Sequence, residues 1–316
     1  MKKVLLDCDP GHDDMMAIML ALYSEELDVL GITTVAGNQT GEKTFLNALK
    51  TLTLIGEKNV VVARGFDKPL FRDLVVAPKI HGVSGLDGAD LPEPEVEPSN
   101  MHAVDFIIET AMNSNESVYL IPTGPLTNVA VALLKEPKIK RKIERIVLMG
   151  GAVFDSNITP ASEFNIFVDP EAARIVFESG VNITMVGLDV TNKALLSFDD
   201  IEEIGKMNGR VSRVISPLLK FFASTNKEVF GINGAPLHDA LAVSYVIDPS
   251  ILKTEYLHVD IETRGEFTRG ETVVDVYRVT GRDPNADVAF EVDVKKFKNL
   301  IFDMIRYFDQ KLKNQG

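Results

Sequence analysis

The stretch VLLDCDPGHDD, Val4–Asp14, decides the fold of this chain. An apolar run with the character of a buried strand, Val4–Leu6, opens it, and an apolar run with the character of a helix, Met15–Leu22, follows it. Four carboxylates stand between or beside these runs: Asp7, Asp9, Asp13 and Asp14. Acids this close together repel one another and resist burial, so a bound cation is the simplest way to stabilise them. Donors that are all oxygen favour a hard ion such as Ca²⁺ or Mg²⁺.

The order of strand and then helix recurs along the chain, which predicts the α/β class with a largely parallel central sheet flanked by helices. Further strands are expected at Leu27–Thr34, Val60–Ala63, Ser117–Ile121, Ile143–Met149 and Ile183–Val186. Helices are expected at Asp13–Tyr23, Gly41–Gly56, Met101–Met112, Leu126–Lys135, Pro170–Ser179, Arg213–Phe230, His238–Val246 and Val294–Phe308. The segment Pro69–Pro98 reads as a long loop, and Tyr256–Val294 as a β-rich C-terminal portion. No repeat or linker interrupts the pattern, so we expect one domain over residues 1–316.

Composition narrows the possible partners. The 316 residues are 45% hydrophobic and carry a net charge of −13, which disfavours a nucleic-acid partner. No stretch is long and uncharged enough to cross a membrane. The single cysteine, Cys8, allows no intrachain disulfide and fits a reducing compartment, so a cytoplasmic location is expected.

Polar clusters follow several of the expected strands, where the loops of a parallel sheet converge on one edge. They are Asp9–Asp14, Gly37–Thr40, Pro122–Pro125, Met149–Gly151, Glu163–Asn165 in the following irregular region, and Leu237–Asp239 at the start of a late helix. Each has a purely structural alternative. Asp13 and Asp14 suit a helix N-terminus, Asn38 suits a turn, and His238 with Asp239 suits a helix cap. Their recurrence at equivalent points nevertheless favours one site assembled from distant segments.

Several reaction classes lack their sequence signatures. The chain has no GxxxxGK[ST] phosphate loop, no GxGxxG dinucleotide motif after a strand and no GxSxG nucleophile turn. Cys8 lies within the acidic cluster, where a thiolate is disfavoured, so a cysteine nucleophile is not expected. We expect His12, His102 and His258 to be surface or structural residues, and the pair Phe221–Phe222 to belong to the core.

DCDPGHDD at Asp7–Asp14 resembles the signature of the inosine-uridine preferring nucleoside hydrolases. Further segments that resemble the family, in family order, are ITTVAGNQT, HGVSGLDG, IPTGPLTN, VLMGG, ASEFNIFVDPEAA, MVGLDVT and APLHDALAVSYVIDP. Together they run from Asp7 to Pro249, about three-quarters of the 316 residues. The resemblance implies a Rossmann-like fold and a Ca²⁺-dependent enzyme that cleaves the N-glycosidic bond of ribonucleosides in nucleoside salvage. It also implies a homodimer or homotetramer.

The resemblance also implies roles for individual residues. The implied calcium ligands are Asp9, Asp14, the Thr123 carbonyl and Asp239. Asp13 would be the base that activates water, and His238 would assist the leaving nucleobase. The implied substrate-binding residues are Asn38, Met149, Asn157, Glu163, Phe164 and Asn165, with His81 in a mobile loop over the nucleobase.

The segment FFASTNKEVF, Phe221–Phe230, lacks the tyrosines and arginine that some protozoal members place near the base, and Asn226 and Phe230 stand roughly at those positions. The turn GAPLHD is more similar to bacterial, pyrimidine-accepting members, so pyrimidine or broad specificity is expected. Two alternatives stay open at this point. One is a phosphatase with Asp7 or Asp9 as nucleophile, although its downstream lysine and second acid pair have no match in order. The other is a nucleoside-binding protein without activity, which would not need Asp13 and His238.

Overall fold

The computed structural model describes residues 1–314, and its main element is an eight-stranded sheet with the order β3-β2-β1-β4-β5-β6-β12-β9. The strands are β1 Lys2–Cys8, β2 Leu27–Thr34, β3 Val62–Arg64, β4 Val118–Pro122, β5 Ile143–Met149, β6 Ile183–Val186, β9 Leu252–Leu257 and β12 Ala286–Val292. All neighbours pair in parallel except β12 and β9, which are antiparallel. The expected α/β class with a largely parallel sheet is therefore confirmed.

The strand order reverses between β1 and β4. From β1 the chain first builds outward to β2 and β3, and it then returns to add β4, β5 and β6 on the other side. The loops that leave the carboxyl ends of β1 and β4 consequently run to opposite faces of the sheet and leave a crevice between them. Asp9 and Thr123 are the residues that directly follow these two strands.

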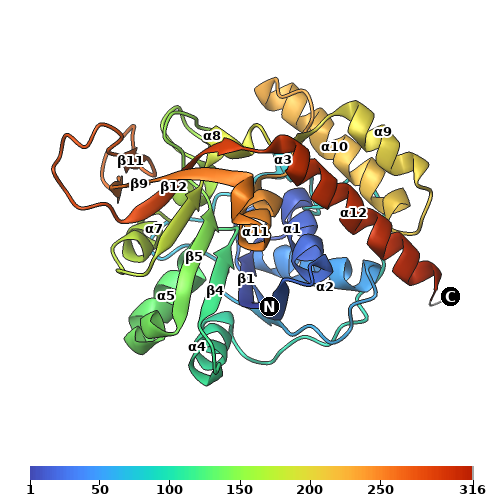
Figure 1. Ribbon diagram of the computed structural model, residues 1–316, viewed down its shortest axis with the longest axis horizontal. Coiled ribbons are helices and arrows are strands. Elements are labelled where there is room, and N and C mark those ends of the chain that lie inside the picture. Colours follow the sequence, from blue (N-terminus) through green and yellow to red (C-terminus); the bar gives the residue numbers. More distant parts are fainter. Residues whose placement is uncertain (315–316) are drawn as a thin grey trace.

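Helices cover both faces of the sheet, as Figure 1 shows. One core contains α1 His12–Tyr23, α2 Gly41–Leu54, α10 Ser212–Phe230, α11 His238–Ile247 and α12 Val294–Lys313; the other contains α4 Ala103–Asn113, α5 Thr127–Lys135 and α7 Pro170–Phe177. Alternate residues of β5 pack into opposite cores: Val147 lies in the first core, and Ile146 and Leu148 lie in the second. Strands buried on both faces explain the continuous apolar runs in the sequence.

Short elements fill the connections, and some of them were not expected. They are α3 Pro78–His81, α6 Phe164–Val168, α8 Leu188–Thr191, α9 Phe198–Lys206, the 3₁₀ helices Pro137–Arg141 and Pro249–Ile251, and the paired strands β7 Leu195–Leu196 and β8 Ala235–Pro236. The expected loop Pro69–Pro98 thus contains one helical turn, α3. Helix α9 was missed, although Ser197 and Asp200 form a capping box at its start, which is a recognisable signal.

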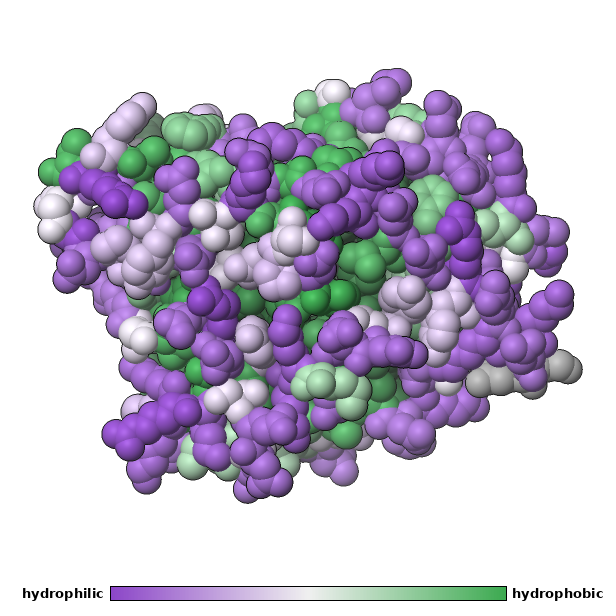
Figure 2. All heavy atoms as spheres, viewed as in Figure 1, coloured by the Kyte–Doolittle hydropathy of each residue, from purple (hydrophilic) through white to green (hydrophobic). Residues whose placement is uncertain are grey.

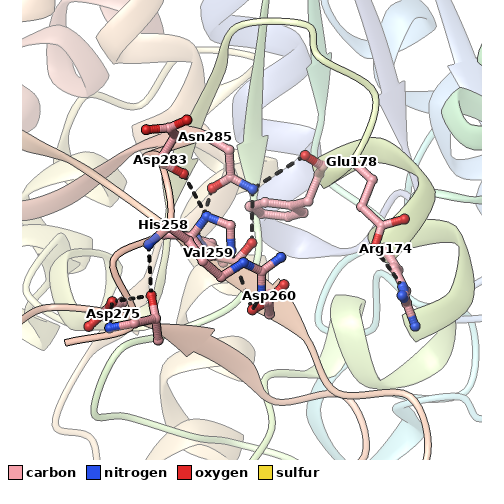
Figure 3. Close-up of polar contacts among 11 residues, drawn as sticks. Arg174, Glu178, His258, Val259, Asp260, Asp275, Asp283 and Asn285 are labelled. Atoms are coloured by element: carbon pink, nitrogen blue, oxygen red, sulfur yellow. Dashed lines mark hydrogen bonds and ion pairs between the residues drawn. The ribbon is translucent and has the colours of Figure 1, made fainter. Parts of the chain in front are cut away.

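The β-rich C-terminal portion is confirmed, and its connection between β9 and β12 is held against α7. It contains an antiparallel pair, β10 Val259–Ile261 and β11 Thr272–Val274. Asn285 accepts a hydrogen bond from the Val259 nitrogen at 2.8 Å and donates one to the Val259 carbonyl at 2.9 Å, as Figure 3 shows. The same amide also donates to the carbonyl of Phe177, the last residue of α7, at 3.4 Å. One side chain therefore joins the connection to the helical layer.

The face of the molecule drawn in Figure 2 is largely hydrophilic, with apolar residues gathered in small patches near its middle. Within residues 1–314, no helix has the length and apolar character that a membrane-spanning segment needs. Cys8, the single cysteine, is buried at the end of β1.

Candidate active site

The site begins at the switch point, where β1 and β4 end side by side. The Thr123 nitrogen donates to the Asp7 carbonyl at 2.9 Å, which joins the two strand ends. The Thr123 hydroxyl donates to Asp14 Oδ1 at 2.8 Å, and the Asp9 nitrogen donates to the same oxygen at 3.2 Å. Because Asp14 lies in the first turn of α1, these bonds fix the helix start against both strands.

Helix α11 brings a further acid into this crevice. Asp239 lies in the first turn of α11, which packs against α1. Carboxylate oxygens of Asp13, Asp14 and Asp239 all lie within 4.8 Å of one another, and all three residues are buried. The structure therefore brings together acids that are distant in the sequence, as the predicted site requires.

Burial dominates the electrostatics of this acidic cluster. It raises the pKa of Asp9, Asp13 and Asp239 well above the usual range, and neighbouring carboxylates raise each further. Burial also raises the pKa of Asp14, although hydrogen bonds act in the opposite direction. The charged form of the cluster is thus unstable by itself, and a bound cation would restore it by supplying opposite charge.

Two buried oxygens of the cluster have no hydrogen-bond partner among the described residues: Asp9 Oδ1 and Asp13 Oδ1. The other Asp9 oxygen accepts from the Asn38 nitrogen at 2.6 Å. A buried acceptor without a donor is costly, so such oxygens are suited to a hard cation. Glycine is required beside them, because a Cβ at Gly37 or Gly124 would lie 2.1 or 2.6 Å from an Asp9 oxygen. The donor set and its surroundings therefore fit a metal ion such as Ca²⁺.

A pocket of about 450 Å³ opens above the acids. It is lined by the predicted site residues Asp13, Asn38, His81, Thr123, Met149, Asn157, Glu163, Phe164, Asn165, His238 and Asp239. The two remaining predicted residues, Asp9 and Asp14, are fully buried just behind them. Pockets of this size, with a few converging polar groups, are typical of small-molecule sites. All the predicted residues are thus brought together, and their individual roles stay predictions.

Three of the asparagine side chains that line the pocket, those of Asn38, Asn157 and Asn165, are each fixed at one end. Asn165 Nδ2 donates to the carbonyls of Thr123 and Met149 at 2.7 and 3.2 Å. Asn157 Oδ1 accepts from the Phe164 nitrogen at 2.8 Å, and Asn38 Nδ2 donates to Asp14 Oδ2 at 3.1 Å. One end of each amide is therefore used in holding the site, which leaves its other end for hydrogen bonds to a ligand.

Glu163 holds the loop beside these amides. It caps α6, which corrects the expectation that Glu163–Asn165 is irregular. Its Oε1 accepts from the Asn165 nitrogen at 2.8 Å, and its Oε2 accepts from the nitrogens of Gly151 and Ile166 at 2.9 and 3.1 Å. Burial nevertheless raises the Glu163 pKa from its ordinary value of 4.5 to about 7.

This shift predicts a pH-dependent stability. The folded protein retains the Glu163 proton up to a pKa of about 7, whereas the unfolded chain releases it near 4.5. The stabilisation is complete below pH 4.5 and is lost as pH rises to about 7, and it amounts to about 3 kcal/mol. Urea unfolding at pH 5 and pH 8 measures this loss. From pH 5 to pH 8, the free energy of unfolding of the wild type should fall by this amount relative to that of Glu163→Gln, which has no titrating group at position 163. If the free energies of unfolding of the wild type and Glu163→Gln differed by the same amount at both pH values, the shift in the Glu163 pKa would be absent.

The far end of the pocket is aromatic. His81 is the last residue of α3 and is 5% exposed, so it is the buried residue of a helical turn in this structure rather than part of an irregular loop. Its ring stacks on Phe222 at a centroid distance of 5.2 Å, and Phe222 stacks on His12 at 5.1 Å. Phe222 is a core residue, as expected, and it also lines the pocket. A flat, apolar wall of this kind suits a planar ring.

Sequence reasoning missed several contributors. Val76, Ala77 and Ile80, from the segment expected to be a loop, line the aromatic end, and no sequence signal distinguishes them. His12 was expected to be surface or structural; its Nδ1 lies 3.2 Å from His81 Nδ1, directly behind the pocket. Thr191 was not singled out, and its hydroxyl lies 2.8 Å from His238 Nδ1.

The structure also bears on the alternative nucleophiles. Asp7 does not line the pocket: Thr33 and Asn128 hold its Oδ1 at 2.6 and 2.8 Å beneath the site. Asp9 is fully buried. Burial and then the charge of Asp14 raise the pKa of the Cys8 thiol well above its usual range, which agrees with the expectation that it is not a nucleophile.

A doubly wound sheet with a pocket and buried acids at its switch point defines the class: an α/β protein that binds a small polar molecule beside an acidic centre. A family model described as inosine-uridine preferring nucleoside hydrolase matches residues 4–299. The chain belongs to this family, and it is therefore an enzyme of the nucleoside hydrolase class. The resemblance inferred from the sequence is confirmed.

Individual relatives agree with this assignment. The chain is 49% identical over 306 residues to the pyrimidine-specific ribonucleoside hydrolase RihA of Escherichia coli, covering 96% of this chain and 98% of RihA. Among solved structures, a purine-preferring ribonucleoside hydrolase from Gardnerella vaginalis has a TM-score of 0.92 at 35% identity, with 98% of this chain and 100% of that chain covered. A nucleoside hydrolase from Bacillus anthracis has a TM-score of 0.77 at 22% identity, with coverage of 97% and 100%, and shows the shared fold.

Proposed function

We propose that this enzyme hydrolyses the N-glycosidic bond of ribonucleosides to ribose and a free nucleobase, with Ca²⁺ as its cofactor and with a preference for pyrimidines. The observation that carries the proposal is the acidic cluster of Asp13, Asp14 and Asp239, of which Asp13 and Asp239 line the pocket and Asp14 is buried behind them. A ring of carboxylates stabilises the positive charge that develops on a ribose when its bond to the base breaks.

The cation would be held by the carboxylates of Asp9, Asp14 and Asp239 and by the Thr123 carbonyl. The unpartnered Asp9 Oδ1 supports this assignment. The Thr123 carbonyl supports it too, because Asn165 Nδ2 occupies only one of the two lone pairs of the carbonyl oxygen. When bound, Ca²⁺ would lower the pKa of a water molecule and accept the 2′- and 3′-hydroxyls of the ribose as ligands.

The chain's own groups account for the proton transfers. A water oxygen forms the new bond to C1′ while the bond from C1′ to the base nitrogen breaks. Asp13 lines the same pocket, and its buried Oδ1 has no hydrogen-bond partner within residues 1–314, so it can take the proton that the water releases. The departing base requires a proton or a hydrogen bond, and His238, the first residue of α11, lines the pocket and can supply it.

The fixed amides support recognition of ribose. Asn38, Asn157 and Asn165 each have one end held by the protein, so their free ends are oriented before the sugar arrives. Groups that are held in advance lose little freedom on binding, and they are left unpaired when a hydroxyl is missing. A sugar without its 2′-hydroxyl should therefore be a poor substrate.

The pyrimidine preference is supported by the 49% identical relative, which is named as pyrimidine-specific. The purine-preferring structural relative is 35% identical, so the overall fold is compatible with either base. Asn226 and Phe230 of α10 line the pocket at its aromatic end, where the sequence lacks the tyrosines and arginine of some protozoal members. Asn226 Nδ2 donates to the Phe222 carbonyl at 2.8 Å, which leaves its oxygen to accept a base N–H.

The test is kcat/KM for uridine, cytidine, inosine, adenosine and guanosine, with calcium and with a chelator. We expect the highest values for the two pyrimidines and loss of all activity in chelator, restored by added Ca²⁺. No base released from any of the five would refute the proposal. Phosphate release from a phosphomonoester in the same assay would favour the phosphatase alternative instead.

Metal binding itself gives an independent prediction. Asp239→Ala should weaken calcium binding by more than about 100-fold, since loss of groups that only support ligands costs about 10–100-fold. Isothermal titration calorimetry of calcium into metal-free protein measures this directly. Asp73→Ala, which removes the same charge from an exposed residue, is the control and should bind as the wild type does. An unchanged calcium affinity in Asp239→Ala would remove Asp239 from the ligand set.

Some broader expectations belong to the same proposal. We treat residues 1–316 as one domain and propose a cytoplasmic enzyme of nucleoside salvage that assembles as a homodimer or homotetramer. The buried, unpaired thiol of Cys8 is compatible with a reducing compartment. Light scattering of the purified protein measures the oligomer directly.

A further inference from the structure

His238 has a buried partner outside the pocket. Thr191 ends the short helix α8, and its hydroxyl oxygen lies 2.8 Å from His238 Nδ1 at the start of α11. Thr191 is 0% exposed, so water cannot reach its hydroxyl. Within residues 1–314, the hydroxyl of Thr191 has no hydrogen-bond partner other than this imidazole nitrogen.

Other threonines in helices use their hydroxyl groups in a different hydrogen bond. Thr51 and Thr53 of α2 donate their hydroxyl hydrogens to the carbonyls of Asn47 and Leu49, four residues earlier, at 2.8 and 2.9 Å. That backbone bond is the common arrangement for a threonine within a helix. The hydroxyl of Thr191 instead faces His238, although the residue at the corresponding earlier position, Gly187, has a carbonyl too.

A buried hydroxyl hydrogen needs an acceptor, and in the part of the chain that the structure describes the only acceptor for Thr191 is His238 Nδ1. A neutral imidazole carries one hydrogen, on either Nδ1 or Nε2. If Nδ1 carried it, the Thr191 hydroxyl hydrogen would be left unpaired in the interior, which is unfavourable. We propose that Thr191 is a positioning residue that holds His238 in the tautomer with its hydrogen on Nε2.

The consequence concerns the pocket, which His238 lines. With Nδ1 occupied by Thr191, the remaining nitrogen, Nε2, offers a hydrogen-bond donor rather than an acceptor. A donor is what a departing nucleobase requires, since its negative charge grows as the bond to C1′ breaks. This consequence rests on the proposed function, whereas the tautomer itself rests only on the geometry of Thr191 and His238.

The rest of α8 holds Thr191 rigidly enough for such a role. Leu188 and Val190 are 0% exposed, so the helix is packed on its inner side. Asp189 accepts hydrogen bonds from the nitrogens of Val153 and Phe154 at 2.7 and 2.9 Å, which fixes the helix to the loop after β5. A short helix held at both its apolar and polar sides keeps its hydroxyl in one place.

The tautomer can be read by NMR without any substrate. The chain has only 5 histidines, so selective ¹⁵N-histidine labelling gives a simple spectrum, and the His238 signals are those lost in His238→Gln. We expect the wild type, saturated with Ca²⁺, to carry hydrogen on Nε2 of His238 and none on Nδ1. Thr191→Ser should retain this pattern, and Thr191→Val should lose it. Hydrogen on Nδ1 in the wild type, or an unchanged pattern in Thr191→Val, would overturn the proposal.

Kinetics separates positioning from general stability. For uridine, Thr191→Val should lower kcat by about tenfold with KM nearly unchanged, and Thr191→Ser should restore kcat. In a His238→Ala background the same substitution should have no further effect on kcat, because its target is absent. An equal loss in both backgrounds would indicate a structural role and overturn the proposal. If no ribonucleoside is cleaved, the proposed function fails, and the NMR pattern alone decides the present inference.

Discussion

Asp13→Ala should reduce kcat for uridine by about 10³–10⁴-fold, which is the upper part of the range for loss of a general base. Asp13 lines the pocket, and among the described residues its buried Oδ1 has no hydrogen-bond partner, so the substitution removes the oxygen that we assign to accept the proton of the attacking water. Calcium binding should be retained, since the assigned ligands Asp9, Asp14 and Asp239 are unchanged. Steady-state release of uracil and calcium calorimetry on the same preparation measure the two quantities.

The structure makes the calcium measurement essential. One carboxylate oxygen of Asp13 lies within 4.8 Å of one of Asp14 and one of Asp239, so Asp13 is near enough to share a cation with them. If Asp13→Ala lost calcium and activity together, Asp13 would be a metal ligand rather than a base. Activity near the wild-type level would contradict either role. Asp13→Asn provides a further control, because it retains the shape of the side chain and removes only its basicity.

The second large effect concerns the sugar. The value of kcat/KM should fall by about 10⁴-fold from uridine to 2′-deoxyuridine, because a site built to bind a hydroxyl leaves its own polar groups unpaired when that hydroxyl is absent. The amides of Asn38 and Asn165 are held by the protein before substrate binds, so they cannot turn to other partners. Base release from the two nucleosides at equal enzyme concentration measures the ratio.

The chemistry of the substrate sharpens this comparison. A 2′-deoxynucleoside loses its base more readily than a ribonucleoside in the absence of enzyme, because the electron-withdrawing hydroxyl is missing. A lower enzymatic rate therefore reports lost recognition rather than lower reactivity. Comparable kcat/KM values for the two nucleosides would mean that the site does not bind the 2′-hydroxyl.

The fold could be predicted well where the sequence pattern is regular. Apolar runs such as Ile143–Met149 are buried on both faces, and that burial is what makes them continuous in the sequence. The alternation of strands and helices gave the parallel sheet. The antiparallel strand β9 and the strand order could not be read in this way, since pairing partners depend on tertiary packing rather than on local periodicity.

The candidate site was predictable for a related reason. Residues that follow parallel strands meet at the same edge of the sheet. Asp9 and Thr123 are far apart in the sequence, but they were expected together for this reason, and they lie at the ends of the neighbouring strands β1 and β4. The place of Asp239 does not follow from the strand ends, because the packing of α11 on α1 is what brings it to the other acids. Its assignment came from the resemblance to the family.

Other parts of the site have no local signature. Ile80 and His81 belong to the helical turn α3, in a segment rich in glycine, proline and charge, and the Thr225 hydroxyl donates to the Ile80 carbonyl of this turn at 2.8 Å. Thr191 reads as an ordinary helix residue until its neighbour in space, His238, is known. Contacts between segments that are distant in sequence decide both cases.

The most direct test of the account is a crystal structure with Ca²⁺ and a non-hydrolysable ribonucleoside analogue. We predict one ion in contact with the carboxylates of Asp9, Asp14 and Asp239 and the Thr123 carbonyl, which also binds the 2′- and 3′-hydroxyls of the sugar. If saturating calcium left these acids apart with no ion between them, or if the analogue bound away from them, the central claim would be contradicted.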